Sequence, residues 1–192
     1  SVLSDQDIEK ACRFTKETGL LEMFSSRVIK SIPDYVIGVE VGLDSNGRKN
    51  RGGTAMETIV GSCVAVICET HGLSFIKQAT ADKIKSLWGI TLKVDKSSRR
   101  FDFVVRLPER IYIIETNYYG GGGSKLKSTA GEYRTLHDYL SKQGQSLIWI
   151  TDGQGWKNTL RPLEECFRYI DYTLNLKMVS EGLLAEILTG NV

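Results

Sequence analysis

The sequence predicts an α/β fold in which a mixed central β-sheet is flanked by α-helices. Residues 101–117 have the pattern of two strands joined by a turn, and residues 54–72 form an apolar helix. Residues 127–143 form a further helix, which leads into the apolar strand 146–150. The hairpin is antiparallel, whereas a helix between two strands implies a crossover to a parallel neighbour. The sheet is therefore expected to be mixed.

The hairpin is the most informative part of the chain. Its strands are residues 101–106, in which apolar and polar side chains largely alternate, and residues 111–117. Pro108 interrupts the pattern and supplies the turn.

The register of the hairpin predicts a pair of carboxylates. If Arg106 faces Ile111, facing residue numbers sum to a constant, and Asp102 then faces Glu115. Facing Cβ atoms lie about 4.5–5.5 Å apart, where like charges are destabilising. A divalent cation makes such a pair tolerable, and oxygen ligands of this kind suit Mg²⁺. The alternative is a wet face of an ordinary hairpin, and a slip of two residues would leave the carboxylates diagonal but close.

Three neighbouring features favour a functional site. Glu115 ends the apolar run 111–114, which is typical of a central strand. Four consecutive glycines at 120–123 suggest backbone that approaches something closely, and Lys125 follows them as a cation suited to a phosphate. Together with Asp102, these features predict a metal-dependent phosphodiester site.

Composition and charge are those of an ordinary globular protein that handles a polyanion. The chain has 192 residues, 41% of them hydrophobic and 25% charged, and we expect one catalytic domain over residues 1–192. The net charge is only +2, but residues 46–51 hold three cations and no acid, and residues 93–106 are also basic. Basic segments beside a carboxylate pair suit DNA. We expect DNA contacts from Arg48, Lys49, Asn50, Arg51, Gly121, Gly122, Ser124 and Lys125.

The cysteines and the termini bear on location. Cys12, Cys63, Cys68 and Cys166 form no CxxC pair and no zinc-ligand framework, which indicates a reducing cytoplasm. Cys63 and Cys68 are expected to be buried thiols on a helix. No signal peptide and no apolar run of spanning length are recognisable, so no membrane contact is expected. The chain begins at Ser1 without Met, and we expect it to lack an N-terminal extension.

The remaining elements are predicted with less detail. Ser4 and Asp7 form a loose capping box, and Asp152 is expected to form a turn rather than to bind a ligand. The other expectations are a helical region over 4–30 divided at Gly19, a strand or loop at 35–43, a polar loop at 44–53, a helix or a loop with a short strand over 74–88, a strand at 91–95, and closing helices at 159–176 and 181–188.

Glu57 has two interpretations that the sequence leaves open. Thr54 is a plausible N-cap, and Glu57 three residues on would complete its capping box. Alternatively, Glu57 is a third acid that a neighbouring helix delivers to the metal site.

The order of elements and several motifs resemble known nucleases. A hairpin with Asp and then Glu-x-polar, followed by a helix and a parallel strand, is similar to the core of restriction-endonuclease-like nucleases, whose motif is PD…(D/E)xK. Three segments more specifically resemble the DpnII/MboI family of type II restriction endonucleases: GLDSNGRKNRGGTAME (42–57), IIETNYYGGGGSKLKS (113–128) and LIWITDGQGW (147–156).

The resemblance implies a Mg²⁺-dependent endonuclease that cuts unmethylated double-stranded DNA at GATC, 5′ of the G in each strand. It implies that Asp102 and Glu115 bind the metal, that Asn117 stands in place of the motif lysine, and that Glu57 matches an acid of the first core helix. A homodimer would match the two-fold symmetry of GATC.

Two departures from the motif bear on mechanism. Phe101 replaces the proline, which only shapes the strand. Asn117 replaces the lysine, so a cation is lost and only hydrogen bonding is kept. Either Lys125 or a second metal ion would have to supply the missing charge.

Three other functions were considered. GGGGSK fails the spacing of a phosphate-binding loop, because no hydroxyl residue follows Lys125. A DNA-binding module without cleavage, and a structure-specific repair nuclease on the same fold, are the alternatives that the sequence leaves open.

Overall fold

The computed structural model describes residues 4–17, 45–94 and 98–190. The chain divides into two compact units, Ser1–Arg48 and Lys49–Val192. The predicted break at Gly19 and the expected strand or loop at 35–43 lie outside the described residues.

Helix α1 (Asp5–Glu17) lies in the first unit and begins as predicted. The Ser4 hydroxyl donates to the Asp7 carboxylate at 2.6 Å, and the Asp7 backbone N–H donates to the Ser4 hydroxyl at 3.3 Å. These reciprocal hydrogen bonds confirm the capping box, and they hold the pKa of Asp7 below its usual range.

The second unit is built on a five-stranded sheet in the order β1-β2-β3-β4-β5. Strands β1, β2 and β3 pair antiparallel, while β3, β4 and β5 pair parallel, so the predicted mixed sheet is confirmed. The strands are β1 (Ser74–Ala79), β2 (Phe101–Arg106), β3 (Ile111–Tyr118), β4 (Ser146–Asp152) and β5 (Tyr172–Leu174).

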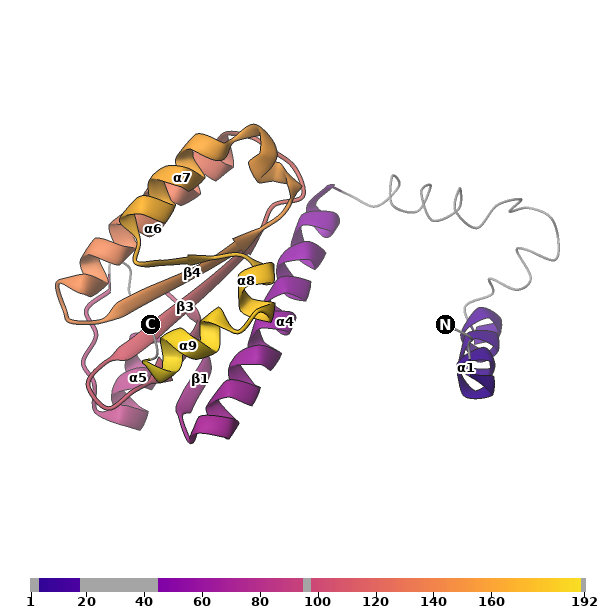
Figure 1. Cartoon of the computed structure of the whole chain (residues 1–192), viewed down its shortest axis with the longest axis horizontal. Coiled ribbons are helices and arrows are strands. Elements are labelled where there is room, and N and C mark those ends of the chain that lie inside the picture. Colours follow the sequence, from indigo (N-terminus) through magenta and orange to yellow (C-terminus); the bar gives the residue numbers. More distant parts are fainter. Residues whose placement is uncertain (1–3, 18–44, 95–97, 191–192) are drawn as a thin grey trace. The chain divides into compact units, whose positions relative to one another are not determined.

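Helices cover both faces of this sheet (Figure 1). Helices α5, α6 and α7 bury apolar side chains against one face, and α4, α8 and α9 against the other. Their bounds are α4 (Ser45–His71), α5 (Ala81–Trp88), α6 (Ser124–Ser141), α7 (Leu160–Tyr169), α8 (Leu176–Ser180) and α9 (Leu183–Thr189), with a 3₁₀ helix, η1 (Gln154–Asn158), after β4.

The predicted hairpin register is confirmed. Arg106 pairs with Ile111 and Val104 pairs with Ile113. Strand β3 lies in the middle of the sheet, and its residues 111–115 are all buried. The apolar run before Glu115 is therefore that of a central strand, as expected.

The predicted loop at 44–53 is wrong, because α4 already begins at Ser45. Thr54 is not an N-cap; it lies inside the helix, and its carbonyl accepts the Thr58 hydroxyl at 2.8 Å. Glycines weaken helices, which misled the prediction. A Cβ atom on Gly52 would approach the Tyr118 ring to 2.7 Å, so glycine there permits close packing of α4 on the end of β3.

Three other element predictions need correction. Residues 91–94 form no strand, and residues 74–88 form strand β1 followed by helix α5. The helix predicted over 159–176 is α7 followed by the short strand β5. Three residues are too few to give a recognisable alternation, so β5 is supported by its pairing with β4.

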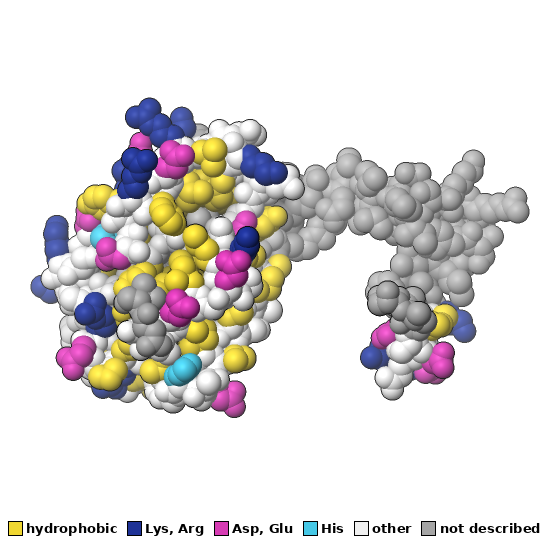
Figure 2. Space-filling model, viewed as in Figure 1, with side chains coloured by type: hydrophobic (Ala, Val, Ile, Leu, Met, Phe, Trp, Pro, Cys, Tyr) yellow, Lys and Arg dark blue, Asp and Glu magenta, His cyan; other side chains and the backbone are white. Residues whose placement is uncertain are grey.

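Helix α4 contains one stretch, Gly52–His71, that is long and apolar enough to cross a membrane by length and composition alone. The expectation that the sequence contains no apolar run of spanning length is therefore wrong by this measure. Four of its side chains, one helical turn apart, are buried against the sheet, as in the core helix of a globular protein: Met56, Val60, Val64 and Cys68. On the face shown in Figure 2, hydrophobic side chains lie among charged ones over the second unit.

Candidate active site

The two predicted acids lie at the same end of the β2–β3 hairpin. The paired residues end at Phe103 and Ile114, and the same register places Asp102 opposite Glu115. One Asp102 oxygen accepts hydrogen bonds from the backbone N–H and the hydroxyl of Thr116, each at 2.8 Å. The Glu115 side chain is buried, with only 7% of its surface exposed.

The electrostatic environment of these two acids favours the binding of a positive ion. Burial raises the pKa of Glu115 well above its usual range, and the charge of Asp102 raises it further. Burial also raises the pKa of Asp102, against the two hydrogen bonds from Thr116. A carboxylate that loses water near another negative charge favours its protonated form. A bound cation would reverse that preference.

Among the residues that the structure describes, Arg99 is the cation that acts on Glu115. Arg99 lowers the pKa of Glu115, and its guanidinium forms an ion pair with Glu132 at 3.2 Å. The Arg99 side chain is only 11% exposed. Because its charge is shared with Glu132, the acids are only partly compensated.

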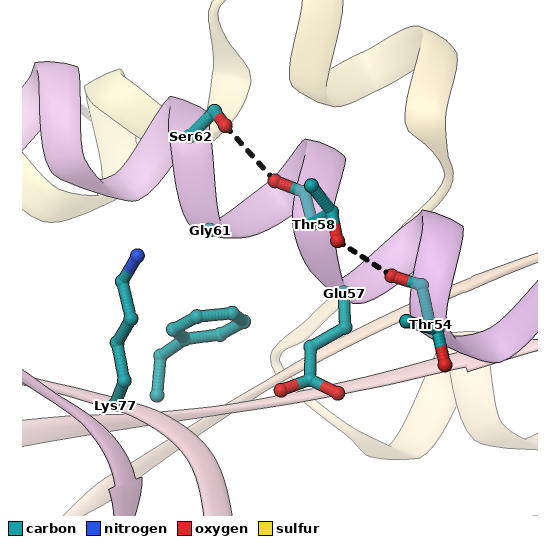
Figure 3. A pocket seen from close by; sticks show the side chains of 7 residues that line it. Thr54, Glu57, Thr58, Gly61, Ser62 and Lys77 are labelled. Carbon is teal, nitrogen blue, oxygen red and sulfur yellow. Dashed lines mark hydrogen bonds between the residues drawn. The ribbon is translucent and has the colours of Figure 1, made fainter.

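Glu57 approaches the pair from α4. It points from the helix toward the sheet (Figure 3), and its charge raises the pKa of both Asp102 and Glu115. One Glu57 oxygen accepts a hydrogen bond from the Gln78 side chain at 2.6 Å. The capping-box interpretation of Glu57 is wrong, since Thr54 lies inside the helix.

Glu57 also lines a groove of about 250 Å³ between α4 and the sheet. The Lys77 side chain of β1 extends toward α4 at its other side (Figure 3). Among the described residues, no group of three or more His, Cys, Asp or Glu side chains is close enough to hold a metal ion. A cation at Asp102 and Glu115 would therefore need water or phosphate oxygens as further ligands.

Asn117, which stands in place of the motif lysine, is held by a hydrogen bond. Its amide oxygen accepts from the Trp149 indole N–H at 2.9 Å. The Tyr133 and Trp149 rings stack with centroids 4.8 Å apart. The carbonyl oxygen of Asn117 is therefore already hydrogen-bonded within the protein, and Tyr133 is a core residue.

Lys125 and the glycine loop line a cavity of about 370 Å³ next to Asn117. Thr116, Glu132 and Gly120–Gly122 also line it, and Lys125 is exposed. Lys125 thus opens onto the same space as Asn117.

Close backbone approach was expected at Gly120–Gly123, but it occurs at Gly153 and Gly155. A Cβ on Gly121 would meet nothing within 4 Å, whereas one on Gly153 or Gly155 would collide with the backbone of Tyr119 or Gly121. Gly123 has φ +145°, which favours glycine. The glycine-rich loop and the turn after β4 therefore pack backbone to backbone.

The remaining predicted residues fall into two groups. Arg48, Lys49, Asn50 and Arg51 lie on the first turns of α4 rather than in a loop, and Ser124 begins α6. Asp152 accepts hydrogen bonds from the backbone N–H groups of Gly153 at 2.6 Å and Leu176 at 3.1 Å, which confirms its structural role.

Two residues that contact the acids were not predicted from the sequence. Thr116 donates twice to Asp102, but a threonine in a strand carries no functional signal of its own. Gln78 contacts Glu57 from a strand whose existence was left open. Arg99 was noted only as part of a basic segment.

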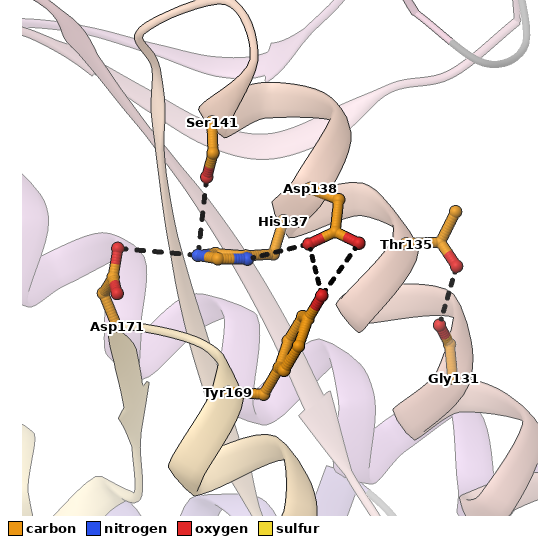
Figure 4. A network of polar contacts seen from close by, with 7 residues as sticks. All are labelled: Gly131, Thr135, His137, Asp138, Ser141, Tyr169 and Asp171. Carbon is orange, nitrogen blue, oxygen red and sulfur yellow. Dashed lines mark hydrogen bonds and ion pairs between the residues drawn. The ribbon is translucent and has the colours of Figure 1, made fainter.

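A second polar network joins α6 to the segment after α7 and contains none of the predicted site residues (Figure 4). The His137 ring lies 3.5 Å from both Asp138 and Asp171, and Tyr169 donates its hydroxyl proton to Asp138 at 2.9 Å. This network connects α6 with the end of α7 on the surface of the protein.

An antiparallel hairpin carrying paired acids, followed by a helix and a parallel strand in a helix-covered mixed sheet, defines a restriction-endonuclease-like core. Comparison with known families agrees, since the DpnII restriction endonuclease family matches residues 1–186. The chain belongs to this family.

Relatives share much of this sequence. The chain is 51% identical to the type II restriction enzyme MjaIII of Methanocaldococcus jannaschii over 97% of its length and 66% of that protein. It is 47% identical to LlaDCHI of Lactococcus lactis subsp. cremoris, over 97% of this chain and 62% of that enzyme. With MboI of Moraxella bovis the identity is 36%, over 94% and 65%. The chain spans less than two thirds of these relatives. No solved structure matches it.

Proposed function

We propose that the protein is a Mg²⁺-dependent type II restriction endonuclease that cleaves double-stranded DNA at unmethylated GATC, 5′ of the G in each strand. The observation that carries this proposal is the Asp102–Glu115 pair at one end of the central hairpin, in a chain of this family. The protein would act on DNA in the cytoplasm.

Asp102 and Glu115 would hold the ion. The donor set fits Mg²⁺, because two carboxylates with adjacent water-accessible space leave room for the waters and phosphate oxygens that this ion prefers. When bound, Mg²⁺ would supply an activated water and neutralise charge on the scissile phosphate. Thr116 keeps one Asp102 oxygen occupied by two hydrogen bonds, which fixes the orientation of the other. Glu57 would act on the ion through a bound water, because the three acids are not close enough together to bind it directly as a set.

Lys125, rather than Asn117, would supply the charge that the motif lysine usually brings. The amide oxygen of Asn117 is already bonded to Trp149, whereas Lys125 is exposed beside the same cavity. Replacing Lys125 with Ala should reduce cleavage about 10²-fold, since a positioned cation near the reacting phosphate contributes on that scale. Replacement of Lys142, which is exposed at the far end of α6, is the matched control.

The first turns of α4 would contact DNA through Arg48, Lys49, Asn50 and Arg51, and the glycine loop through Gly121, Gly122, Ser124 and Lys125. Replacing Lys49 with Ala distinguishes two roles. Loss of a phosphate contact weakens binding to all sequences and flattens the salt dependence by about one unit of slope, whereas loss of a base contact relaxes specificity at one position. No change in either quantity would remove Lys49 from the interface.

The protein would act as a two-fold symmetric homodimer, because GATC reads the same on both strands and one centre cuts one strand. Helices outside the hairpin would form the interface. Two pairs of exposed apolar side chains, each two turns apart, support this: Ile59 and Val66 on α4, and Leu160 and Phe167 on α7. Sedimentation with a GATC duplex should give two protomers per duplex. Because α4 and α7 cover opposite faces of the sheet, a single two-fold interface uses one of these surfaces, so only one of Val66→Glu and Phe167→Glu should abolish that stoichiometry. One protomer per duplex at saturation would refute the dimer.

Digestion of plasmid DNA tests the function itself. With Mg²⁺, the protein should give the discrete fragments expected from GATC sites, and none with EDTA or with a plasmid that lacks GATC. Absence of fragments under all conditions would favour a DNA-binding module without cleavage. Nicks only at branched junctions would favour a structure-specific repair nuclease.

A further inference from the structure

Gln78 has a backbone conformation that stands out in the sheet. Its φ of +48° is the only positive value among non-glycine residues in the described parts of the chain. This left-handed region is unfavourable for residues with a Cβ atom, and such conformations persist where the surrounding structure enforces them. Regular pairs enclose Gln78 on both sides: Lys77 with Phe103, and Ala79 with Phe101.

The unusual φ changes which face of the sheet the strand residues occupy. In a regular strand, side chains two apart share a face. Ile76 and Ala79 are three residues apart, yet both belong to the core under α5, α6 and α7. On β2, Phe101 belongs to that same core, but Phe103 belongs to the core under α4. The alternation of side chains between the two faces of the sheet is therefore interrupted in both strands. The interruption lies at Gln78 in β1 and at Asp102 in β2, which the register places opposite each other.

This interruption directs the Gln78 side chain to the acids rather than into the α5–α6–α7 core. Its amide nitrogen donates to Glu57 at 2.6 Å, and Gln78 is also close enough to Asp102 to lower the pKa of that acid. A glutamine amide has two N–H donors and no charge, so it can serve two carboxylates that repel each other. Gln78 thus connects the acid of α4 to the acid of β2.

We propose that Gln78 is a positioning residue that holds Glu57 beside Asp102, so that the carboxylate of α4 is available to the cation held by Asp102 and Glu115. This inference rests on the proposed function. The strained backbone of Gln78 contributes to this positioning, because it turns the side-chain carboxamide from the edge strand β1 toward helix α4.

Replacing Gln78 with Gly tests the proposal, because glycine keeps the left-handed conformation and removes the carboxamide. The Mg²⁺ affinity of the full chain is measured by calorimetry without DNA, in the wild-type and in the Glu57→Ala background. Groups that orient metal ligands typically affect affinity 10-fold or more. We expect Gln78→Gly to weaken Mg²⁺ binding about 10-fold in the wild-type background. In the Glu57→Ala background it should have an effect of less than about 2-fold, because a residue that acts through Glu57 has nothing left to position.

Two further variants serve as controls for this comparison. Ser74→Gly introduces glycine at the opposite, exposed end of β1 and should leave Mg²⁺ affinity unchanged. Gln78→Asn tolerates the left-handed backbone but is one methylene shorter, so it should reproduce the loss even if the glycine variant is poorly folded.

Equal weakening in both backgrounds, or none in either, would overturn the proposal. A wild-type chain that binds no Mg²⁺ would overturn it as well, and the plasmid digestion would then show separately whether the proposed function survives.

Discussion

The two halves of the candidate site differ in how far apart in the chain their contacts lie. In the β2–β3 hairpin, a short turn and the strand alternation bring Asp102 and Glu115 together. In the other half, Glu57 on α4 meets Gln78 on β1 at 2.6 Å, through the packing of a helix on a sheet and one left-handed residue. The geometry of the hairpin half is determined by residues near each other in the chain, whereas that of the Glu57–Gln78 half is determined by tertiary packing.

The largest effect is expected in the hairpin half. Asp102→Asn removes a charge that the proposed Mg²⁺ site needs, and cleavage should fall about 10³-fold or more, since metal stabilisation of the transition state is worth several kcal/mol. Single-turnover cleavage of a GATC duplex measures this. Asp152→Asn is the control: it removes one of the two backbone hydrogen bonds that Asp152 accepts at the end of β4, so it should lower stability while the folded fraction still cleaves. Equal losses in both variants would place Asp102 outside the chemistry.

A smaller effect is expected where a neighbour only orients an acid. Thr116→Val removes the hydroxyl donor to Asp102 but keeps the backbone donor. Cleavage should fall about 10-fold, as for other groups that orient metal ligands. Thr135→Val, on the exposed face of α6, removes a hydroxyl that donates to a helix carbonyl and should leave the rate unchanged. An unchanged rate in Thr116→Val would show that the backbone donor suffices.

Metal-free stability should depend on pH through Glu115. Its folded pKa is raised by burial and by Asp102, above the ordinary value of 4.5 that it keeps when unfolded. Its contribution to stability is therefore fully present below pH 4.5 and is lost as pH rises through the folded pKa. Urea unfolding in EDTA between pH 4 and 8 should show this loss in the wild type but not in Glu115→Gln. Identical pH profiles would mean that Glu115 is not desolvated.

The smallest effect concerns the start of α4. Gly53→Ala meets no atom within 4 Å and should stabilise the protein by about 0.5–1 kcal/mol through helix propensity. Gly52→Ala forces the Tyr118 ring aside, so it should be less stable than Gly53→Ala by about 1 kcal/mol or more. Urea denaturation compares the two. Tyr118→Ala should remove the difference, and its persistence would contradict the packing of α4 on β3.

The sequence predicted the parts of the fold whose information is local. The alternation of β2, the apolar run of β3 and the Pro108 turn were enough to predict the register and the adjacency of Asp102 and Glu115. The parallel crossover through α6 followed from element order alone.

The rest depends on contacts between distant residues. Gly47, Gly52 and Gly53 near the start of α4 predict a loop by propensity, whereas the packing of Gly52 on Tyr118 is a tertiary contact that the sequence does not show. The left-handed φ of Gln78 has no signal in a sequence, because glutamine rarely adopts it. Strand β5 is too short to be recognised without its partner β4.

The central claim is that the Asp102–Glu115 pair is the cation site of a nuclease. Calorimetric titration of Mg²⁺ into the metal-free wild-type protein and into Glu115→Gln tests it most directly, with circular dichroism as the check that both are folded. The account predicts saturable binding by the wild type and its loss in Glu115→Gln, while the variant still binds a GATC duplex at least as tightly. Equal Mg²⁺ binding by the two proteins would contradict it.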